Sequence, residues 1–361
     1  MTDHPVARLS QLIETIDKPV LCIIGVGLIG GFISSFIGCS DLVDLHLIGR
    51  QNLRNRLERY ECLKAENIDG TTRSLKNSDF TLHSSLTEMI QIKRIKPQFI
   101  IMCLKRTAAD EIYQEIKKLE LKSCTIVLMM NGIFTVTEAK KILTNHKILA
   151  AMCPFNVIDD QATGVYKQSS KGNIIIEQDE QSEILSNIMN NSGVPTLLST
   201  QIEKVQNGKM LFNLNNAICA LSGVPLSKEL SQYGYRRLLS HCMSETLSVY
   251  YARGMEAAPV FKLPNHLVPW ALCAPDWIFS YIAAGMAGPT EKATSSMYED
   301  VSNNRLTEIE YLQGAVLKLA NGLDPKIDTP VIQAVYDKIK QVESNKCGIV
   351  KHTPEMIYQF K

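Results

Sequence analysis

Apolar and polar positions alternate with two different periods, and the change divides the chain into two parts. Up to about residue 200, short apolar runs typical of buried strands alternate with amphipathic stretches typical of helices. The strand-like runs are 20–24, 45–50, 80–82, 98–104, 125–130, 148–152, 173–177 and 196–199. This order predicts an α/β, doubly wound (Rossmann-type) domain over residues 18–200, preceded by an N-terminal extension, residues 1–17.

From about Ile202 onwards, apolar residues recur at spacings of three and four, which predicts helices. The expected helices are 209–220, 236–253, 277–287 and 330–342. Two sequences, Ser296–Glu299 and Thr307–Glu310, match the Ser/Thr-x-x-Glu capping box, so each should open a helix. Residues 201–361 are therefore predicted to form an all-α C-terminal domain.

The first predicted strand leads into a glycine-rich turn and then an apolar helix. The turn reads Gly25-Val26-Gly27-Leu28-Ile29-Gly30. In a dinucleotide-binding unit, the first glycine makes the tight turn, the second lets the backbone approach the pyrophosphate, and the third lets helix and strand pack closely. The helix N-terminus adds amide donors for the phosphates. The motif predicts a dinucleotide-binding site built by these six residues.

The same stretch could also be read as a membrane segment. Residues 19–40 contain no charged residue and are long enough to span a bilayer. Five glycines and two serines interrupt the run, however, and strands buried in a parallel sheet are also continuously apolar. Residues 1–18 are mixed in charge, unlike the basic leader of a signal peptide. We therefore expect no membrane partner.

The end of the second predicted strand bears on the choice of cofactor. A carboxylate at this tip favours NAD, whereas an arginine favours the 2′-phosphate of NADP. Here the tip is Gly49-Arg50, while Asp41 and Asp44 lie at the opposite end of the strand. The sequence thus favours NADP, with a solvated loop charge as the alternative for Arg50. Lys105, Asn131 and Asn156 also follow strands, which places them near the cofactor.

Composition narrows the class of protein further. Lys and Arg number 38 against 37 Asp and Glu, a net charge of +1, so electrostatics gives no case for a nucleic-acid partner. The ten cysteines stand singly, without a CxxC or a His-Cys spacing that would indicate a metal site. Unpaired cysteines in apolar runs suit a reducing compartment, hence the cytoplasm.

A polar face on the first helix of the second domain is the strongest candidate for chemistry. Lys209, Asn213 and Asn216 are spaced four and three apart, so one helix face carries all three. A lysine and two carboxamides on an otherwise apolar helix suit a polar cleft against a dinucleotide. A helix edge exposed to water is the alternative.

Taken together, these motifs resemble the ketopantoate reductase (2-dehydropantoate 2-reductase) family, in which a Rossmann domain precedes an all-helical domain. The resemblance extends from Val20 to about Lys340. It rests on Gly25–Gly30, Lys105, Asn131-Gly132, Lys209-x-x-x-Asn213, Ser295–Asp300 and Thr307–Glu310. The chain departs from the family at Ala217, where a second asparagine is common, and in the segment Cys153–Val157.

The resemblance implies NADPH-dependent reduction of 2-dehydropantoate to pantoate, in the pathway to pantothenate and coenzyme A. By this resemblance, Lys209 would be the general acid. A lysine suits that role when burial or nearby charge lowers its pKa. The other implied contacts are Arg50 and Lys105 with the NADP phosphate, Asn131 with nicotinamide and substrate, and Asn213, Asn216, Ser296 and Glu308 with the substrate.

Three other functions remain open from the sequence. One is reduction of another branched 2-oxoacid. An opine-type dehydrogenase is a second, but it would want a His–Asp pair, and His241 and His266 have no convincing partner. A non-catalytic NADP sensor is a third, although it could dispense with Lys209 and Glu308, which are both present. A homodimer is possible, and the sequence does not decide it.

Overall fold

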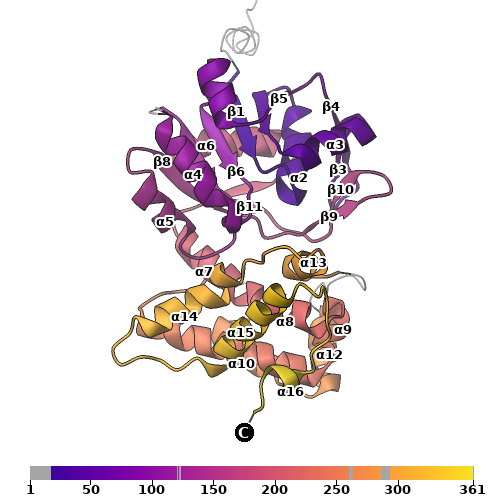
Figure 1. Ribbon diagram of the computed structural model, residues 1–361, viewed down its shortest axis with the longest axis vertical. Helices are drawn as coiled ribbons and strands as arrows, with labels where there is room; N and C mark the ends of the chain where they lie inside the picture. Colours follow the sequence, from indigo (N-terminus) through magenta and orange to yellow (C-terminus); the bar gives the residue numbers. More distant parts are fainter. Residues whose placement is uncertain (1–17, 120, 122, 260–262, 286–292, 361) are drawn as a thin grey trace, which may run out of the picture.

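The computed structural model describes residues 18–119, 121, 123–259, 263–285 and 293–360, and it consists of two stacked parts (Figure 1). The strands lie in the upper part, and the lower part is built from helices. The last strand ends at Ser199 and the first helix of the lower part begins at Ile202. The predicted N-terminal extension, residues 1–17, lies outside the described residues.

The main sheet has eight strands in the order β12-β11-β8-β7-β6-β1-β2-β5. Their bounds are β1 (Val20–Ile24), β2 (Asp44–Ile48), β5 (Thr81–His83), β6 (Phe99–Met102), β7 (Thr125–Leu128), β8 (Lys147–Met152), β11 (Ile174–Glu177) and β12 (Thr196–Ser199). Neighbouring strands are parallel except for the pair β8–β11. Strand β1 lies between β2 and β6, the point where the strand order reverses and where such sheets bind ligands.

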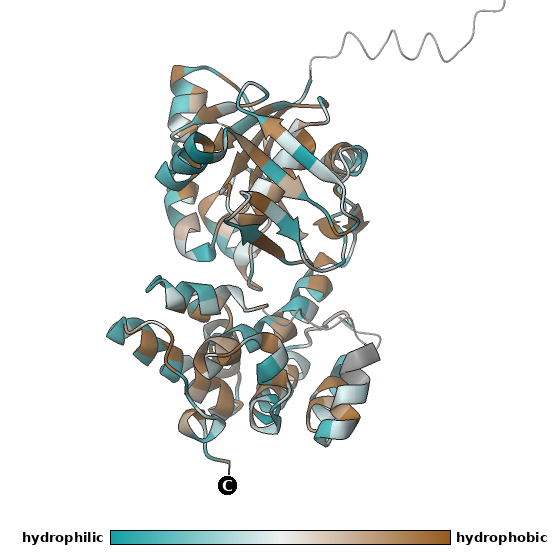
Figure 2. Cartoon of the chain, turned by 90° about the vertical axis from the view of Figure 1, so that its right-hand side faces the viewer, coloured by the Kyte–Doolittle hydropathy of each residue, from teal (hydrophilic) through white to brown (hydrophobic). Residues whose placement is uncertain are grey.

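Helices cover both faces of this sheet, which confirms the predicted doubly wound domain. Along β1, Leu21 and Ile23 pack into one apolar cluster with the helices α2 (Leu28–Gly38) and α6 (Glu180–Asn191). Cys22 belongs to a second cluster on the opposite face. The bounds of the remaining helices here are α3 (Gln51–Tyr60), α4 (Ala109–Lys118) and α5 (Thr135–Ile142). Because β1 is buried on both faces, it is continuously apolar. The helices of the lower part, by contrast, carry both hydrophobic and hydrophilic residues in Figure 2.

The apolar stretch that could be read as a membrane segment is thus divided between β1 and α2. Helix α2 has 11 residues. Among the helices of the described residues, none combines the length and the apolar composition needed to cross a bilayer.

A second, four-stranded sheet in the order β4-β3-β10-β9 was not predicted. Its strands are β3 (Cys62–Glu66), β4 (Thr72–Lys76), β9 (Val157–Asp160) and β10 (Val165–Gln168). They are short and rich in charged residues, so their apolar periodicity is weak. The sheet packs on α2, where a Cβ at Gly31 would come within 2.2 Å of the Tyr166 ring. Arg56, which follows the predicted NADP-binding arginine, binds this sheet through both carboxylate oxygens of Asp159 at 2.9 Å.

The second part contains helices and no strand among its described residues, which confirms the predicted all-α C-terminal domain. Its helices are α7 (Ile202–Asn213), α8 (Asn215–Ser222), α9 (Leu226–Leu230), α10 (Tyr233–Ala252), η3 (Asn265–Leu267), α11 (Val268–Leu272), α12 (Asp276–Gly285), α13 (Ser296–Ser302), η4 (Ile309–Tyr311), α14 (Gln313–Asn321), α15 (Pro330–Asn345) and α16 (Pro354–Ile357). Its core is one cluster of buried apolar side chains.

One prediction about these helices was wrong in detail, and another can be compared only in part. The expected single helix 209–220 begins earlier, at Ile202, and is interrupted at Leu214. The carbonyl of Leu214 accepts a hydrogen bond from Gln313 Nε2 at 2.8 Å. This bond to a side chain of another helix is additional to the backbone hydrogen bonds of a regular helix. The helix expected over 277–287 runs to Gly285, and residues 286–287 lie outside the described residues.

Neither predicted capping box has the expected bonds, although helical turns follow both sequences. Ser295, one residue earlier than predicted, caps α13, since its Oγ accepts from the Tyr298 amide at 3.0 Å. Thr307 Oγ1 accepts from the Ile309 amide at 3.2 Å before η4. The carboxylate of Glu310 instead binds the hydroxyl of Tyr336 at 2.7 Å, because α15 lies within its reach.

Candidate active site

The glycine-rich turn has the shape that a dinucleotide needs. Gly25 has φ +90°, a conformation that side chains disfavour, and a Cβ at Gly30 would lie 2.2 Å from the Gly25 carbonyl oxygen. A Cβ at Gly27 would meet no atom within 4 Å, so the backbone there is open to a ligand. Helix α2 begins directly afterwards, at Leu28. The tight turn, the open backbone and the helix N-terminus together fit a pyrophosphate.

The two cations expected at the NADP phosphate are both engaged by carboxylates of this chain. Arg50 precedes α3 and forms an ion pair with Glu111 at 2.9 Å, with both side chains about three-quarters exposed. Lys105 follows β6 and forms an ion pair with Asp300 of α13, in the other domain. Asp300 is buried and also accepts from Arg305 Nε at 3.0 Å. The phosphate contacts of Arg50 and Lys105 stay a prediction.

Lys209 lies on α7 and reaches across to the Rossmann-type domain. Its Nζ donates a hydrogen bond to the backbone carbonyl of Cys153, just after β8. Burial lowers the pKa of Lys209, although Cys153 and Glu308 nearby act in the opposite sense. Burial also raises the pKa of the Cys153 thiol to about 11, so this neighbour is uncharged at neutral pH. A lysine with a lowered pKa releases its proton more readily, as a general acid must.

A hydrogen-bonded network joins three of the other predicted residues. Glu308 is 7% exposed and accepts from the Arg106 amide at 2.9 Å and from Asn131 Nδ2 at 3.1 Å. Asn131 Oδ1 in turn accepts from Asn213 Nδ2 at 3.5 Å. Asn131 follows β7, Asn213 ends α7 and Glu308 precedes η4, so the network ties the two domains together.

Between the domains, a small cavity that opens to solvent is lined by residues from both. Its lining residues are Met130, Asn131, Gly132, Met152, Gln206, Lys209, Met210 and Asn213. The cavity thus brings together three predicted site residues, Asn131, Lys209 and Asn213, beside a wall of methionines. The sequence analysis missed Gln206, although its position three residues before Lys209 puts both on one helix face.

Three predicted substrate residues do not line this cavity. One of them, Glu308, lies behind Asn131, to which it is hydrogen-bonded. Asn216 lies beyond the interruption at Leu214, partly buried, and its backbone carbonyl accepts from Ser295 Oγ at 2.9 Å. Ser296 is exposed in the first turn of α13. The contact with Ser295 places Asn216 and Ser296 near each other, and their substrate contacts stay a prediction.

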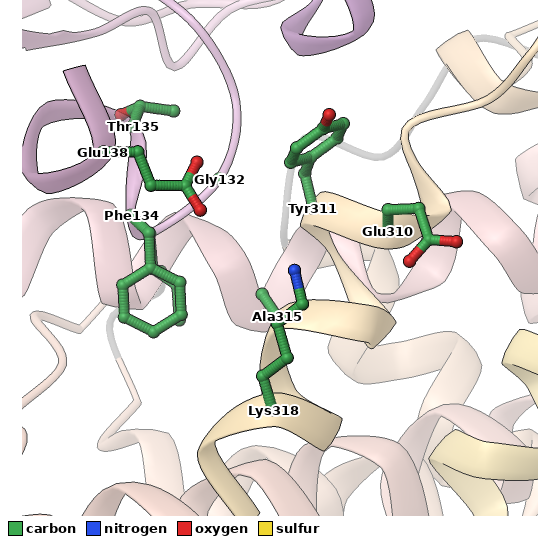
Figure 3. A pocket seen from close by; sticks show the side chains of 9 residues that line it. Gly132, Phe134, Thr135, Glu138, Glu310, Tyr311, Ala315 and Lys318 are labelled. Carbon is green, nitrogen blue, oxygen red and sulfur yellow. The ribbon is translucent and has the colours of Figure 1, made fainter. Parts of the chain in front are cut away.

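A second cavity lies on the other side of the loop after β7 (Figure 3). Phe134 and Glu138 face it from the Rossmann-type domain, and Tyr311 and Lys318 from the helical domain. Beside it, the guanidinium of Arg106 lies 4.9 Å from the centre of the Tyr311 ring and donates to Glu138 at 2.8 Å. These contacts hold the two domains together behind the first cavity.

Within the described ranges, no three His, Cys, Asp or Glu side chains group closely enough to hold a metal ion. The candidate site combines a glycine-rich turn that fits a dinucleotide with a partly buried lysine of the helical domain, which lies among amides and methionines. Such an arrangement defines a two-domain, dinucleotide-dependent oxidoreductase.

Comparisons with known proteins place the chain more narrowly. The family described as ketopantoate reductase PanE/ApbA matches residues 21–181, and its C-terminal counterpart matches residues 201–343. The chain belongs to the ketopantoate reductase PanE/ApbA family, whose members are oxidoreductases. This confirms the resemblance seen in the sequence.

Individual relatives agree with this placement. The chain is 25% identical to a 2-dehydropantoate 2-reductase of Lactococcus lactis subsp. lactis (strain IL1403) over 290 residues. The aligned region covers 77% of this chain and 87% of that protein. A PanE/ApbA family ketopantoate reductase from Ralstonia eutropha JMP134 has a similar fold, with a TM-score of 0.73, 18% identity, and coverage of 90% of this chain and 99% of that one. D-mandelate dehydrogenase, in a ternary structure with NADH and anilino(oxo)acetate, has a TM-score of 0.70, 19% identity, and coverage of 90% and 98%.

Proposed function

We propose that this protein reduces 2-dehydropantoate to pantoate with NADPH. The observation that carries the proposal is the position of Lys209, whose pKa is lowered by burial and which lines a cavity shared with Asn131 of the dinucleotide-binding domain. Membership of the ketopantoate reductase family and the relative in Lactococcus lactis support this choice of substrate.

The residues that line the cavity, and Glu308 beside them, have distinct roles in this proposal. A reduced nicotinamide, when bound, supplies the hydride for the ketone carbon of the substrate. Lys209 Nζ donates a proton to the ketone oxygen as negative charge develops there, which completes the alcohol. Asn131 and Asn213 donate amide hydrogens to the reacting groups. Glu308 fixes the orientation of Asn131 and accepts a hydrogen bond from the substrate hydroxyl.

NADP is the proposed cofactor because of Arg50, at the tip of β2. Its partner Glu111 forms an exposed ion pair, a kind of contact worth little free energy in water. A 2′-phosphate carries more charge than a single carboxylate and offers several acceptor oxygens, so it can displace Glu111. Lys105 is proposed as a second phosphate contact, once released from Asp300.

Reduction of another 2-oxoacid is the second candidate. Met130, Met152 and Met210 line the cavity, and methionine side chains adapt to ligands of different shape. The similar fold of D-mandelate dehydrogenase favours the same candidate. An opine-type reaction has less support, since His241 packs against Phe360 at 4.7 Å between ring centres and His266 is exposed. A non-catalytic sensor would not need a partly buried lysine at position 209.

A homodimer and a cytoplasmic location complete the proposal. Large aromatic side chains are exposed on neighbouring helices of the second domain, Trp270 on α11 and Trp277 and Tyr281 on α12. Exposed aromatic groups of this size often mark an interface, here with a second copy of the chain. Size-exclusion chromatography with light scattering measures the assembly. All ten cysteines are free thiols, as suits a reducing compartment.

One experiment tests the function. Oxidation of NADPH and of NADH is followed with 2-dehydropantoate, branched 2-oxoacids without a hydroxyl, and phenylglyoxylate, the oxoacid of mandelate. We expect the highest kcat/KM for 2-dehydropantoate with NADPH. A higher value for another oxoacid would transfer the proposal to the second candidate. Tight NADPH binding without turnover of any oxoacid would favour the sensor.

A further inference from the structure

We propose that the carboxamide of Gln206 binds the carboxylate of the substrate, as a positioning contact additional to the residues described above. This inference rests on the proposed function, because it needs a 2-oxoacid in the cavity. It extends that function by naming the group that recognises the feature common to all 2-oxoacids.

The first observation is a buried hydrogen-bond donor without a partner. Gln206 is 9% exposed and lines the cavity together with Lys209. Its Nε2 has no hydrogen-bond partner among the described residues. A buried donor in this state costs stability, since it gave up its hydrogen bonds to water without replacing them. A ligand that accepts from Nε2 would recover this loss on binding.

The neighbouring polar groups have partners, which sets Gln206 apart. Asn213 donates to Asn131, and Lys209 donates to the carbonyl of Cys153. Asn207, the next residue on α7, donates to the Glu256 carbonyl at 2.8 Å. Among the polar side chains that line the cavity in the described chain, the amide of Gln206 is thus the unengaged donor.

Helix geometry relates Gln206 to the reacting atoms. Gln206 and Lys209 are three residues apart on α7, so they share a face and their Cα atoms are separated by about 4.5 Å along the axis. In a 2-oxoacid the carboxylate is bonded directly to the ketone carbon. When the ketone oxygen faces Lys209, the carboxylate therefore lies within reach of the adjacent turn. The methionines of the wall cannot donate a hydrogen bond to it.

Charge makes this arrangement useful for the reaction. A carboxylate held beside Lys209 favours the protonated amine, which opposes the effect of burial on its pKa. The acid is then protonated when a substrate is present. A neutral amide holds the anion without adding a second cation that would work against this effect.

The main test is Gln206→Met, which keeps the length of the side chain and removes the donor. We expect kcat/KM to fall roughly 10- to 100-fold for every 2-oxoacid that the wild type reduces, the usual loss for a hydrogen bond to a charged group. Thermal stability should stay equal or rise, because an unpaired buried donor is gone. A purely structural role predicts the opposite, a lower Tm. Gln201→Met, at the exposed start of the same helix, is the control.

A binding measurement separates the substrate from the cofactor. Oxamate, whose carboxylate and adjacent carbonyl reproduce a 2-oxoacid, is titrated by calorimetry into the NADP-loaded enzyme. Gln206→Met should weaken oxamate binding by a similar factor and leave the Kd of NADPH within twofold of the wild type. Gln206→Glu, with the same shape but a negative charge, should weaken it more. It also serves as the second variant if Gln206→Met does not fold.

The other outcomes are distinct from one another. If the wild type reduces no 2-oxoacid, the proposed function and this inference both fail. If the wild type is active and Gln206→Met matches it in kcat/KM and oxamate affinity, the inference alone fails. Weaker NADPH binding in the variant would instead assign the amide to the cofactor. A loss confined to hydroxylated substrates would assign it to their side chain, and either result overturns the carboxylate contact.

Discussion

The cofactor side and the substrate side of this site are built in different ways. On the cofactor side, a continuous stretch, Gly25–Gly30, sets the shape of the cradle through its own backbone, and Arg50 beside it is 74% exposed. On the substrate side, Asn131, Lys209 and Glu308 come from separate segments. Asn131 is hydrogen-bonded to the buried Glu308 and lines the same cavity as Lys209.

The difference indicates where each property of the enzyme resides. Ion pairs at the surface are weak and exchange with water, so changes there should shift the choice of cofactor by modest factors. Glu308 is buried, Lys209 is partly buried, and each is hydrogen-bonded to the other domain. Water cannot readily take over these contacts, so changes there should reduce turnover strongly. The predictions below test this contrast, from the largest expected effect to the smallest.

The largest effect is expected from Lys209→Ala. Turnover should fall by roughly two to four orders of magnitude, the range for loss of a positioned acid. The Kd of NADPH should change little, because the first domain holds most of the cofactor. Lys204→Ala is the matched control, since Lys204 lies on the same helix and forms an ion pair with Glu256. A Lys209→Ala enzyme with the kcat of the wild type would show that the proton comes from another group.

The second prediction concerns Glu308→Gln. The amide keeps the shape of the carboxylate but turns one acceptor oxygen into a donor, facing the donors Arg106 N or Asn131 Nδ2. For a hydroxylated substrate, kcat/KM should fall roughly 10- to 100-fold, mainly through KM. With an oxoacid that lacks the hydroxyl, the loss should be smaller. Glu310→Gln, whose carboxylate binds Tyr336 instead, should leave both values unchanged. Equal losses for both substrates would contradict the hydroxyl contact.

The third prediction is a pH dependence that follows from the lowered pKa of Lys209. A general acid must be protonated, so kcat/KM should fall about tenfold per pH unit above that pKa. Because burial lowers the pKa, the fall should begin below about 10.4, where an ordinary lysine titrates. The pH at which kcat begins to fall should be higher than the pH at which kcat/KM begins to fall, since a bound carboxylate favours the protonated amine. In Lys209→Arg, the fall of activity at high pH should disappear. If the fall persists in this variant, another titrating group causes it.

The fourth prediction returns to the cofactor side. Arg50→Ala should weaken NADPH binding roughly tenfold and leave NADH binding unchanged, because only NADPH carries the 2′-phosphate. The measurement is a fluorescence titration of both reduced cofactors. Arg54→Ala, four residues further along α3, is the control for a general loss of positive charge. Equal affinity of the wild type for the two cofactors would show that Arg50 does not select NADPH over NADH.

The smallest effect is expected from Glu111→Gln. This change frees Arg50 from its exposed ion pair and should tighten NADPH binding by only about two- to threefold. Raising the salt concentration should reduce the difference from the wild type, since exposed ion pairs are screened. A tenfold or larger gain would mean that the cofactor side is held more rigidly than its exposure indicates.

Prediction from sequence succeeded where neighbouring residues determine the structure. The strand β1, the turn Gly25–Gly30 and α2 follow from a short apolar run, three spaced glycines and an apolar helix, and they were all predicted in place. The helical domain follows from periodicity in the same way. The family resemblance added the roles proposed for Lys209 and Glu308, which spacing alone does not assign.

Prediction failed where packing between distant segments decides the outcome. The small sheet β4-β3-β10-β9 joins two strands that lie between β2 and β5 in the sequence to two that lie between β8 and β11. Its strands are rich in charged residues and show little apolar period. The interruption at Leu214 depends on the side chain of Gln313, 99 positions away. The shifted cap of α13 depends on a choice between two adjacent serines that have the same local propensity.

The sequence by itself therefore determined the glycine-rich turn and the order of the two domains, because local conformation and periodicity are properties of neighbouring residues. The tertiary structure decided which groups these residues meet. Lys105 meets Asp300 across 195 positions, Glu308 meets the loop of Arg106 across 202, and Gln206 is left with an unpaired donor in the cavity. Such pairings arise only when distant segments pack together, so no local pattern records them.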